Sequence, residues 1–151
     1  MGKLEILDCT LRDGGYYNNW DFDDNLVDHY LEAVNNLPID YVEIGYRSNE
    51  IDGYFGEYFF TSVKLIKSIS DKLVTAKLAL MIDVKNTAEA DLDSLFSSIT
   101  DYCDLVRMAV APGKLDEALS ISAKLKSMGY KTALNLMYMS NVDLNDEFIA
   151  K

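Results

Sequence analysis

The chain has 151 residues, of which 49% are apolar and 26% are charged. This balance is typical of a globular domain with a sizeable core and excludes a disordered chain. Acidic residues outnumber lysine and arginine by 25 to 14, which gives a formal net charge of -11. Such a surface repels phosphate backbones and anionic lipids, so we expect no nucleic-acid partner and no membrane partner.

Cysteine usage and the N-terminal residues predict a cytoplasmic protein. The two cysteines, Cys9 and Cys103, have no metal-binding C-x-x-C spacing and are too few for a disulfide framework. The N-terminus lacks the apolar segment of a signal peptide, and the longest apolar stretch, around residues 78–82, is far too short to span a bilayer.

Five short apolar runs alternate along the chain with segments of helical period. The runs are nearly continuous in apolar character, as in strands buried on both faces of a parallel sheet. They cover residues 4–9, 41–46, 76–82, 105–111 and 132–138.

Between the runs, apolar residues recur every three or four positions, which predicts amphipathic helices. The stripes are Leu26, Tyr30, Val34 and Leu37; Phe59, Val63, Ile66 and Ile69; Leu92, Leu95, Phe96 and Ile99; and Leu115, Ala118, Leu119, Ser122 and Leu125. Asn86 and Glu89 have the spacing of a capping box, and Gly129 is placed to end a helix. Residues 144–151 also have a helical pattern.

This alternation predicts an α/β fold with a parallel sheet. A complete doubly wound sheet, with strand order 2-1-3-4-5, and the first five strands of a (β/α)8 TIM barrel, in order 1-2-3-4-5, both fit the pattern. The chain ends inside a helical pattern without a cap. We therefore expect residues 1–151 to be a single domain, the N-terminal part of a truncated barrel.

The first run leads into D-C-T-L-R-D-G-G, residues 8–15, at a strand end where both folds bind ligands. Asp13 could supply a carboxylate to a divalent cation, and Arg12 could stabilise an oxyanion or an enolate. The two glycines would allow a sharp turn or a close approach to a ligand. The alternative is a capping aspartate and an Arg–Asp surface pair in a tight turn.

Three later runs each carry one polar side chain, namely Glu43, Arg107 and Asn135. Burying an isolated charge is costly, so such residues need a partner, a metal or a substrate. Polar residues that face one cavity from three strands form the pattern of a barrel active site. A structural ion pair between Glu43 and an arginine is the alternative. Asp83 and Arg47, next to strand ends, are weaker candidates.

Residues 16–20, with the sequence Y-Y-N-N-W, are expected to form a polar-aromatic loop. The loop would line a carbonyl substrate pocket or pack as an unselective lid. The only histidine, His29, falls in a helical segment and is expected at the surface. The sequence contains no dinucleotide-binding, P-loop or zinc-protease motif.

The motif at residues 8–15 resembles the first-strand motif of the DRE-TIM metallolyases, in particular the aldolase branch with 4-hydroxy-2-oxovalerate aldolase and related aldolase-like proteins. The resemblance covers the whole chain as the first five strands of their barrel. It implies that Asp13 binds a divalent metal cation (Mg, Mn or Zn) and that Arg12 stabilises an enolate.

The same resemblance matches Glu43 to the acidic position on the second strand, and Arg107 and Asn135 to inward polar positions on the fourth and fifth. Two features of the family are missing. The sequence has no His-x-His pair, and the aldolases' histidine soon after R-D-G is replaced by Gly15, Tyr16 and Tyr17. We take Tyr16 as the candidate for the missing base, with Tyr17 as the other possibility.

The leading hypothesis is a metal-dependent carbon–carbon lyase or aldolase that acts on a 2-oxo acid or related small carbonyl compound through an enolate. A Claisen-type acyltransferase of the isopropylmalate or homocitrate synthase type would use the same motif. The third hypothesis is a non-enzymatic receiver-like module. Receiver domains carry acidic residues after the first and third strands, and Asp8, Asp13 and Asp83 have similar positions. A five-strand fragment leaves open sheet edges, so we expect this chain alone to be inactive and to associate with itself.

Overall fold

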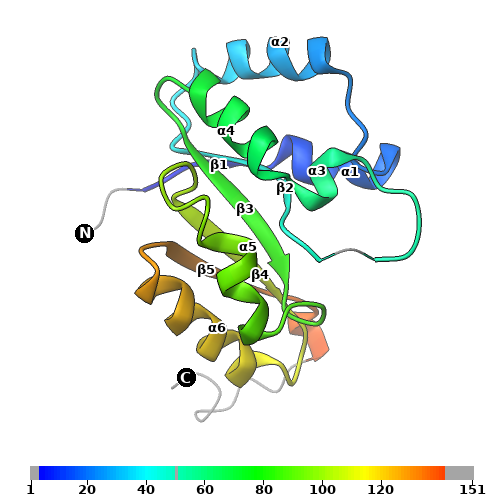
Figure 1. Cartoon of the computed structure of the whole chain (residues 1–151), viewed down its shortest axis with the longest axis vertical. Helices are drawn as coiled ribbons and strands as arrows, with labels where there is room; N and C mark the ends of the chain where they lie inside the picture. Colours follow the sequence, from blue (N-terminus) through cyan, green and yellow to red (C-terminus); the bar gives the residue numbers. More distant parts are fainter. Residues whose placement is uncertain (1–3, 50, 142–151) are drawn as a thin grey trace.

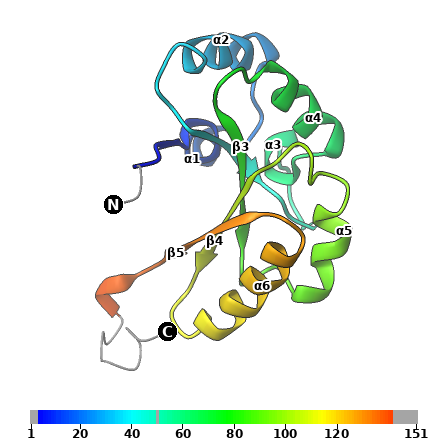
Figure 2. The same cartoon turned by 90° about the vertical axis from the view of Figure 1, so that its left-hand side faces the viewer.

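The computed structural model describes residues 4–49 and 51–141. Its five strands are β1 (Leu7–Asp8), β2 (Tyr41–Tyr46), β3 (Lys77–Asp83), β4 (Leu105–Val110) and β5 (Lys131–Leu136). Each strand pairs in parallel with the next, in the order β1-β2-β3-β4-β5. The sheet curls as part of a barrel (Figures 1 and 2). The partial-barrel prediction is therefore confirmed, and the doubly wound alternative, which needs β1 between β2 and β3, is wrong.

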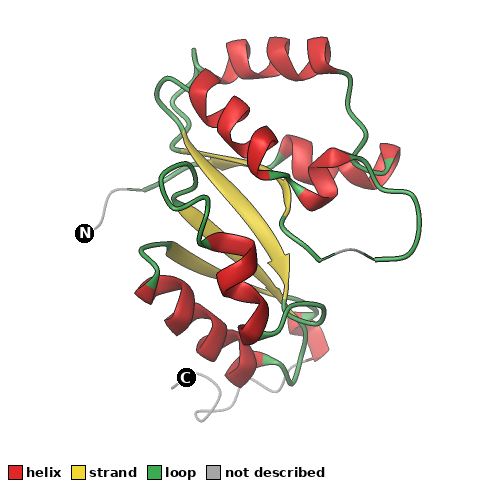
Figure 3. Ribbon diagram, in the orientation of Figure 1, coloured by secondary structure: helices red, strands yellow, loops and turns green. Residues whose placement is uncertain are grey.

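Helices connect the strands, and α2, α4, α5 and α6 lie along the same face of the sheet (Figures 2 and 3). The helices are α1 (Thr10–Asn18), α2 (Asp24–Val34), α3 (Glu57–Phe60), α4 (Val63–Lys72), α5 (Leu92–Phe96) and α6 (Leu115–Ser127), with 3-10 turns η1 (Glu89–Asp91) and η2 (Met139–Asn141). Side chains cap two of them, because Asp23 and Ser62 accept hydrogen bonds from backbone N–H groups in the first turns of α2 and α4.

The two faces of the sheet carry different residues because successive strand side chains point in opposite directions. Leu78, Leu80 and Ile82 of β3 join the main core under the helices and are at most 2% exposed. Burial of each such side chain contributes about 1.5–3 kcal/mol to stability. The opposite, concave face holds a smaller cluster of Tyr41, Ala79 and Leu105.

Strand register arranges the concave face in rows across the sheet. One row runs Glu43, Ala79, Leu105, Lys131; the next runs Met81, Arg107, Ala133; and the third runs Asp83, Ala109, Asn135. Stacked rows of inward side chains are typical of barrel interiors. The polar residues that the sequence marked on β2, β4 and β5 therefore share this face.

Several expected helix details differ in the structure. The segment from Phe59 to Ile69 is two helices, because Thr61 adopts a left-handed φ of 37° and its hydroxyl donates to the Tyr46 carbonyl at 2.7 Å. The expected capping box was wrong, since Asp91 rather than Glu89 accepts from a backbone N–H, that of Ala88. Leu26, Leu37 and Leu119 are exposed at 57%, 52% and 37% instead of belonging to buried stripes. Gly129, at φ 102°, follows the end of α6 as predicted.

The predicted helix at residues 144–151 lies outside the described residues. Within the described part of the chain, none of the helices has the length and apolar character needed to cross a bilayer.

Candidate active site

The motif after β1 forms a helix, so the prediction of a sharp turn followed by a loop was wrong. Arg12, Gly14, Gly15 and Tyr16 all lie within α1, and the next residue after the helix, Asn19, has a left-handed φ of 55°. A Cβ on Gly15 would lie 2.1 Å from the Trp20 ring, whereas one on Gly14 would meet only Phe22 at 3.6 Å. The glycine at position 15 is therefore needed for contact with Trp20.

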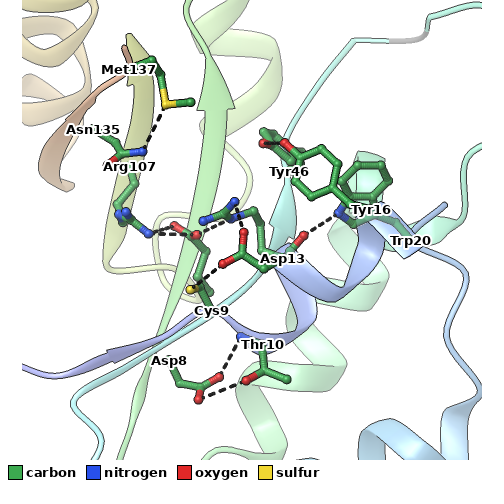
Figure 4. Close-up of polar contacts among 12 residues, drawn as sticks. Asp8, Cys9, Thr10, Asp13, Tyr16, Trp20, Tyr46, Arg107, Asn135 and Met137 are labelled. Carbon is green, nitrogen blue, oxygen red and sulfur yellow. Dashed lines mark hydrogen bonds and ion pairs between the residues drawn. The ribbon is translucent and has the colours of Figure 1, made fainter. Parts of the chain in front are cut away.

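Asp8 has a structural role at the start of this helix. Its carboxylate accepts hydrogen bonds from the Thr10 backbone N–H at 2.9 Å and the Thr10 hydroxyl at 3.2 Å (Figure 4). It also accepts a bond from the Tyr30 hydroxyl at 2.5 Å. These contacts form an Asx-type turn ahead of α1, whose N-cap residue is Cys9 and has no side-chain cap.

Glu43 holds two arginines on the concave face of the sheet. Its side chain is fully buried and accepts from Arg12 Nε at 2.8 Å. One terminal nitrogen of Arg107 donates to both Glu43 oxygens, at 3.0 and 3.2 Å. The side chains of Arg12 and Arg107 are 11% and 19% exposed. The three residues together carry one net positive charge, which the Asp13 carboxylate paired with Arg12 balances.

Arg12 also joins the two acidic residues that the sequence marked. Its terminal nitrogen lies 2.5 Å from Asp13 Oδ1, while its Nε contacts Glu43. Burial alone would lower the pKa of the Arg12 guanidinium, but the hydrogen bond and charge of Glu43, with help from Asp13, raise it. Arg12 is therefore a fixed cation that can stabilise negative charge but cannot donate its proton.

The second oxygen of Asp13 accepts from the Cys9 thiol at 3.0 Å (Figure 4). Burial, together with the hydrogen bond to Asp13 and its charge, raises the pKa of the Cys9 thiol to about 11. Burial likewise raises the pKa of the Cys103 thiol to about 12. Neither cysteine is an activated nucleophile, because a nucleophilic thiolate needs a lowered pKa.

The structure distinguishes between the two tyrosines that follow the glycines. Tyr16 stands four residues after Arg12 in α1 and so shares its helix face. The Tyr16 hydroxyl lies 2.8 Å from the Tyr46 hydroxyl, at the end of β2 (Figure 4). Tyr17 points away and is 96% exposed. Burial and the hydrogen bond to Tyr16 raise the pKa of Tyr46, so this phenol stays protonated at neutral pH.

The remaining sequence candidates lie at the edges of this cluster. Asn135 is one row beyond Arg107 and donates to the sulfur of Met137 at 3.4 Å, so it does not join the Glu43 network. Asp83, at the end of β3, accepts from the Lys85 backbone N–H at 2.9 Å. Arg47 is not a solvated loop charge, because its guanidinium donates to three backbone carbonyls in α3, α5 and the residue after α3.

The described residues could supply only part of a metal site. Among them, no group of three His, Cys, Asp or Glu side chains is placed to hold a metal. The Asp13 side chain is 54% exposed, and its two carboxylate oxygens contact Arg12 and Cys9. A hard divalent cation requires several oxygen or nitrogen ligands, so Asp13 alone does not make a site.

The chain is similar to a solved relative, the N-terminal domain of a putative aldolase from Bacteroides vulgatus. The two agree with a TM-score of 0.92 at 42% sequence identity, over 98% of this chain and 49% of that chain. This chain therefore spans about half the length of that relative. No family model matches the sequence, and no curated protein matches it. In fold and in sequence, the chain is aldolase-like.

Sequence reasoning named Tyr16 and Trp20 as possible pocket residues but missed Tyr46, Phe55 and Phe59, which line the same pocket. Trp20 is 5% exposed, and its indole nitrogen donates to the Arg12 carbonyl at 3.0 Å. It packs edge-on against Tyr16, Tyr46 and Phe59 at ring-centroid distances of 4.7, 5.7 and 5.0 Å. The run of aromatic residues from Tyr54 to Phe60 was the available signal, since so many rings close together predict a shared packing site.

Proposed function

We propose that the chain forms the N-terminal part of a metal-dependent carbon–carbon lyase of the DRE-TIM class, which cleaves a 2-oxo acid or related carbonyl compound through an enolate. The observation that supports it is the arrangement of Arg12 and Arg107 on one buried carboxylate, Glu43. Guanidinium groups stabilise the negative charge of an enolate and bind the carboxylate of a 2-oxo acid through charge-assisted hydrogen bonds. The aldolase-like relative supports the same reaction class.

In this proposal each residue has a separate task. Arg12 contacts the enolate oxygen, Glu43 positions both guanidinium groups, and Arg107 holds the substrate carboxylate. During cleavage, the proton leaves the C4 hydroxyl, the C3–C4 bond breaks, and its electron pair forms the enolate while an aldehyde departs. Tyr16, hydrogen-bonded to the protonated Tyr46, takes up this hydroxyl proton as it passes its own phenol proton to water, and the enolate carbon then takes a proton from water to give the 2-oxo acid product.

The proposed cofactor is a divalent cation, Mg²⁺, Mn²⁺ or Zn²⁺, with Asp13 as one ligand. The metal would polarise the substrate carbonyl as a Lewis acid. Because Asp13 alone is insufficient, we propose that the other ligands come from residues outside the described ones. The substrate is a small molecule, and the assembly is a possible homo-oligomer.

Proton exchange tests the enolate directly. Pyruvate incubated in D₂O with the full-length protein and Mg²⁺, Mn²⁺ or Zn²⁺ should lose its methyl proton signal, because an enolate takes up solvent deuterium. A Claisen-type acyltransferase would instead exchange the α-protons of an acyl-CoA. Exchange confined to the acyl-CoA would replace the lyase proposal by the acyltransferase, and exchange of neither compound would refute both.

The role of Tyr16 can be measured against its neighbour. Tyr16→Phe should lower kcat for cleavage of a 4-hydroxy-2-oxo acid about 100-fold, within the range for loss of a proton-transfer group. Tyr17→Phe removes the same hydroxyl from a 96% exposed side chain and should leave kcat unchanged. Equal effects of the two substitutions, measured in steady-state assays of the full-length protein, would exclude Tyr16 from proton transfer.

A further inference from the structure

A pocket of about 380 Å³ opens beside the Arg12 cluster, next to the ends of β2 and β3. Its aromatic walls are Tyr16, Trp20, Tyr46, Phe55 and Phe59. Small-molecule sites typically have this size, aromatic walls and few polar groups. Tyr16 belongs both to this pocket and to the proposed proton-transfer pair, so a ligand in the pocket would lie beside the reacting groups.

The walls form an ordered set of rings. Trp20 meets Tyr16, Tyr46 and Phe59 at interplanar angles between 64° and 79°. Phe55 stacks on Phe59 with centroids 4.3 Å apart. Aromatic pairs favour such edge-on and offset-stacked geometries, so a set that presents both ring edges and ring faces suits another planar ring.

The charge of the pocket lining determines whether the pocket binds the anionic or the neutral end of a substrate. Asp83 is the charged residue among those that line it, and the described structure records no ion pair for this carboxylate. An anionic group is therefore repelled here and attracted to Arg12 and Arg107. The polar lining, which also includes Asn86 and Ser48, can hydrogen-bond a neutral hydroxyl.

A second cavity makes a weaker candidate. It measures about 640 Å³ and is lined by Glu5, Tyr41 and Lys131 among others. Arg107 also lines it, but Glu5, Tyr41 and Lys131 lie at the amino ends of the strands, where Lys131 already donates to the Tyr41 hydroxyl at 2.7 Å and to Glu5 at 3.1 Å. In barrels this end contributes to stability, whereas ligands bind at the carboxyl ends.

We propose that the aromatic pocket binds a neutral, hydroxyl-bearing planar ring, carried by the aldehyde-derived end of the substrate. The assignment of this ring to a substrate rests on the lyase function proposed above, while binding of the ring itself does not. The substrate would then lie with its carboxylate on the arginines and its ring against Trp20. The expected substrate class is a 4-hydroxy-2-oxo acid with an aryl group rather than a small alkyl group.

Trp20 is the chain's single tryptophan, so its fluorescence reports directly on the pocket. Benzyl alcohol should change the Trp20 emission saturably with a millimolar Kd, as expected for a ligand of so few atoms. Benzoate, which has the same ring with a negative charge, should bind about fivefold more weakly because of Asp83. Asp83→Asn should remove most of this difference and change benzyl alcohol binding less than twofold.

A substitution that fills the pocket provides a second test without removing core packing. Ser48→Phe should abolish the saturable response to benzyl alcohol, whereas Ser98→Phe, at an exposed serine outside the lining, should retain it. An unchanged response in Ser48→Phe would overturn the proposal. Tighter binding of benzylamine than of benzyl alcohol would overturn it in favour of a cation site, and an equal response to glycerol would overturn the requirement for a ring.

These titrations need neither metal nor turnover, so they are independent of the proposed reaction. Absence of lyase activity together with benzyl alcohol binding would refute the reaction and leave the pocket assignment standing. Lyase activity on small alkyl substrates, with no binding of benzyl alcohol, would refute the ring pocket and leave the reaction standing.

Discussion

Glu43→Gln should lower the free energy of unfolding by about 3–5 kcal/mol, the cost of removing one partner from a buried ion pair. The substitution keeps the shape of the side chain but leaves Arg107, whose side chain is 19% exposed, without its ion pair, and leaves Arg12 paired with Asp13 alone. Urea denaturation monitored by circular dichroism would measure the loss.

Asp104→Asn is the matched control, because it makes the same change in an exposed pair. Asp104 lies 2.6 Å from Lys77, and their side chains are 39% and 57% exposed. Surface pairs of this kind contribute less than about 1 kcal/mol. A loss in Glu43→Gln no larger than in Asp104→Asn would show that the buried carboxylate does not hold the cluster together.

Gly15→Ala should destabilise the protein by about 3 kcal/mol, at the upper end of the usual cost of overpacking. The new methyl group would lie 2.1 Å from the Trp20 ring. That ring cannot easily move away, because its nitrogen is bonded to the Arg12 carbonyl and its faces and edges are packed by other aromatic residues. Thermal and urea unfolding would record the loss, and a blue or red shift of Trp20 emission would report the displaced ring.

The neighbouring glycine should respond in the opposite direction. Gly14→Ala places a methyl group in ordinary contact with Phe22, at 3.6 Å, and lies within the same helix. Alanine is favoured over glycine in a helix interior, so this variant should gain about 0.5–1 kcal/mol. Equal losses in both variants would mean that α1 does not require glycine for the Trp20 contact.

The strands were predictable from sequence because burial on both faces leaves continuous apolar runs. The runs at β2 and β4 match the structure closely, whereas the first run gives only Leu7–Asp8 as strand. Leu4, at its start, is 82% exposed. The sequence shows no alternation of apolar and polar residues along the strands. One face of each strand packs under helices, and the other faces a partly filled barrel interior.

Helix α1 could not be predicted, because its sequence contains two adjacent glycines and residues common in turns. Tertiary contacts override these local preferences: Arg12 bonds to Glu43, and Trp20 covers Gly15. Once the segment is a helix, the four-residue spacing from Arg12 to Tyr16 places both on one face. The Tyr16–Tyr46 contact and the aromatic pocket depend on that helix, which is why sequence alone did not give them.

The ion pair of Glu43 was foreseen as one of two alternatives, and the structure shows features of both. Glu43 bonds to Arg107 across the sheet, as a structural pair would. It also holds Arg12 beside the aromatic pocket, as a positioning residue in an active site would. Residue types and strand positions predict such proximity, but they cannot say which arginine is bound, because that depends on register and on rotamers.

The sequential pairing of the strands bears on how the chain is made. Each strand pairs with the strand that precedes it in the sequence. Its partner has therefore already been synthesised when the strand leaves the ribosome. Each new crossover therefore adds to a template that is already present, with a loop of limited entropy to close. At every stage of synthesis the most recent strand is the growing edge. A pause in translation just after β2 would then expose the half of the ion-pair network that contains Arg12 and Glu43 before Arg107 has been made.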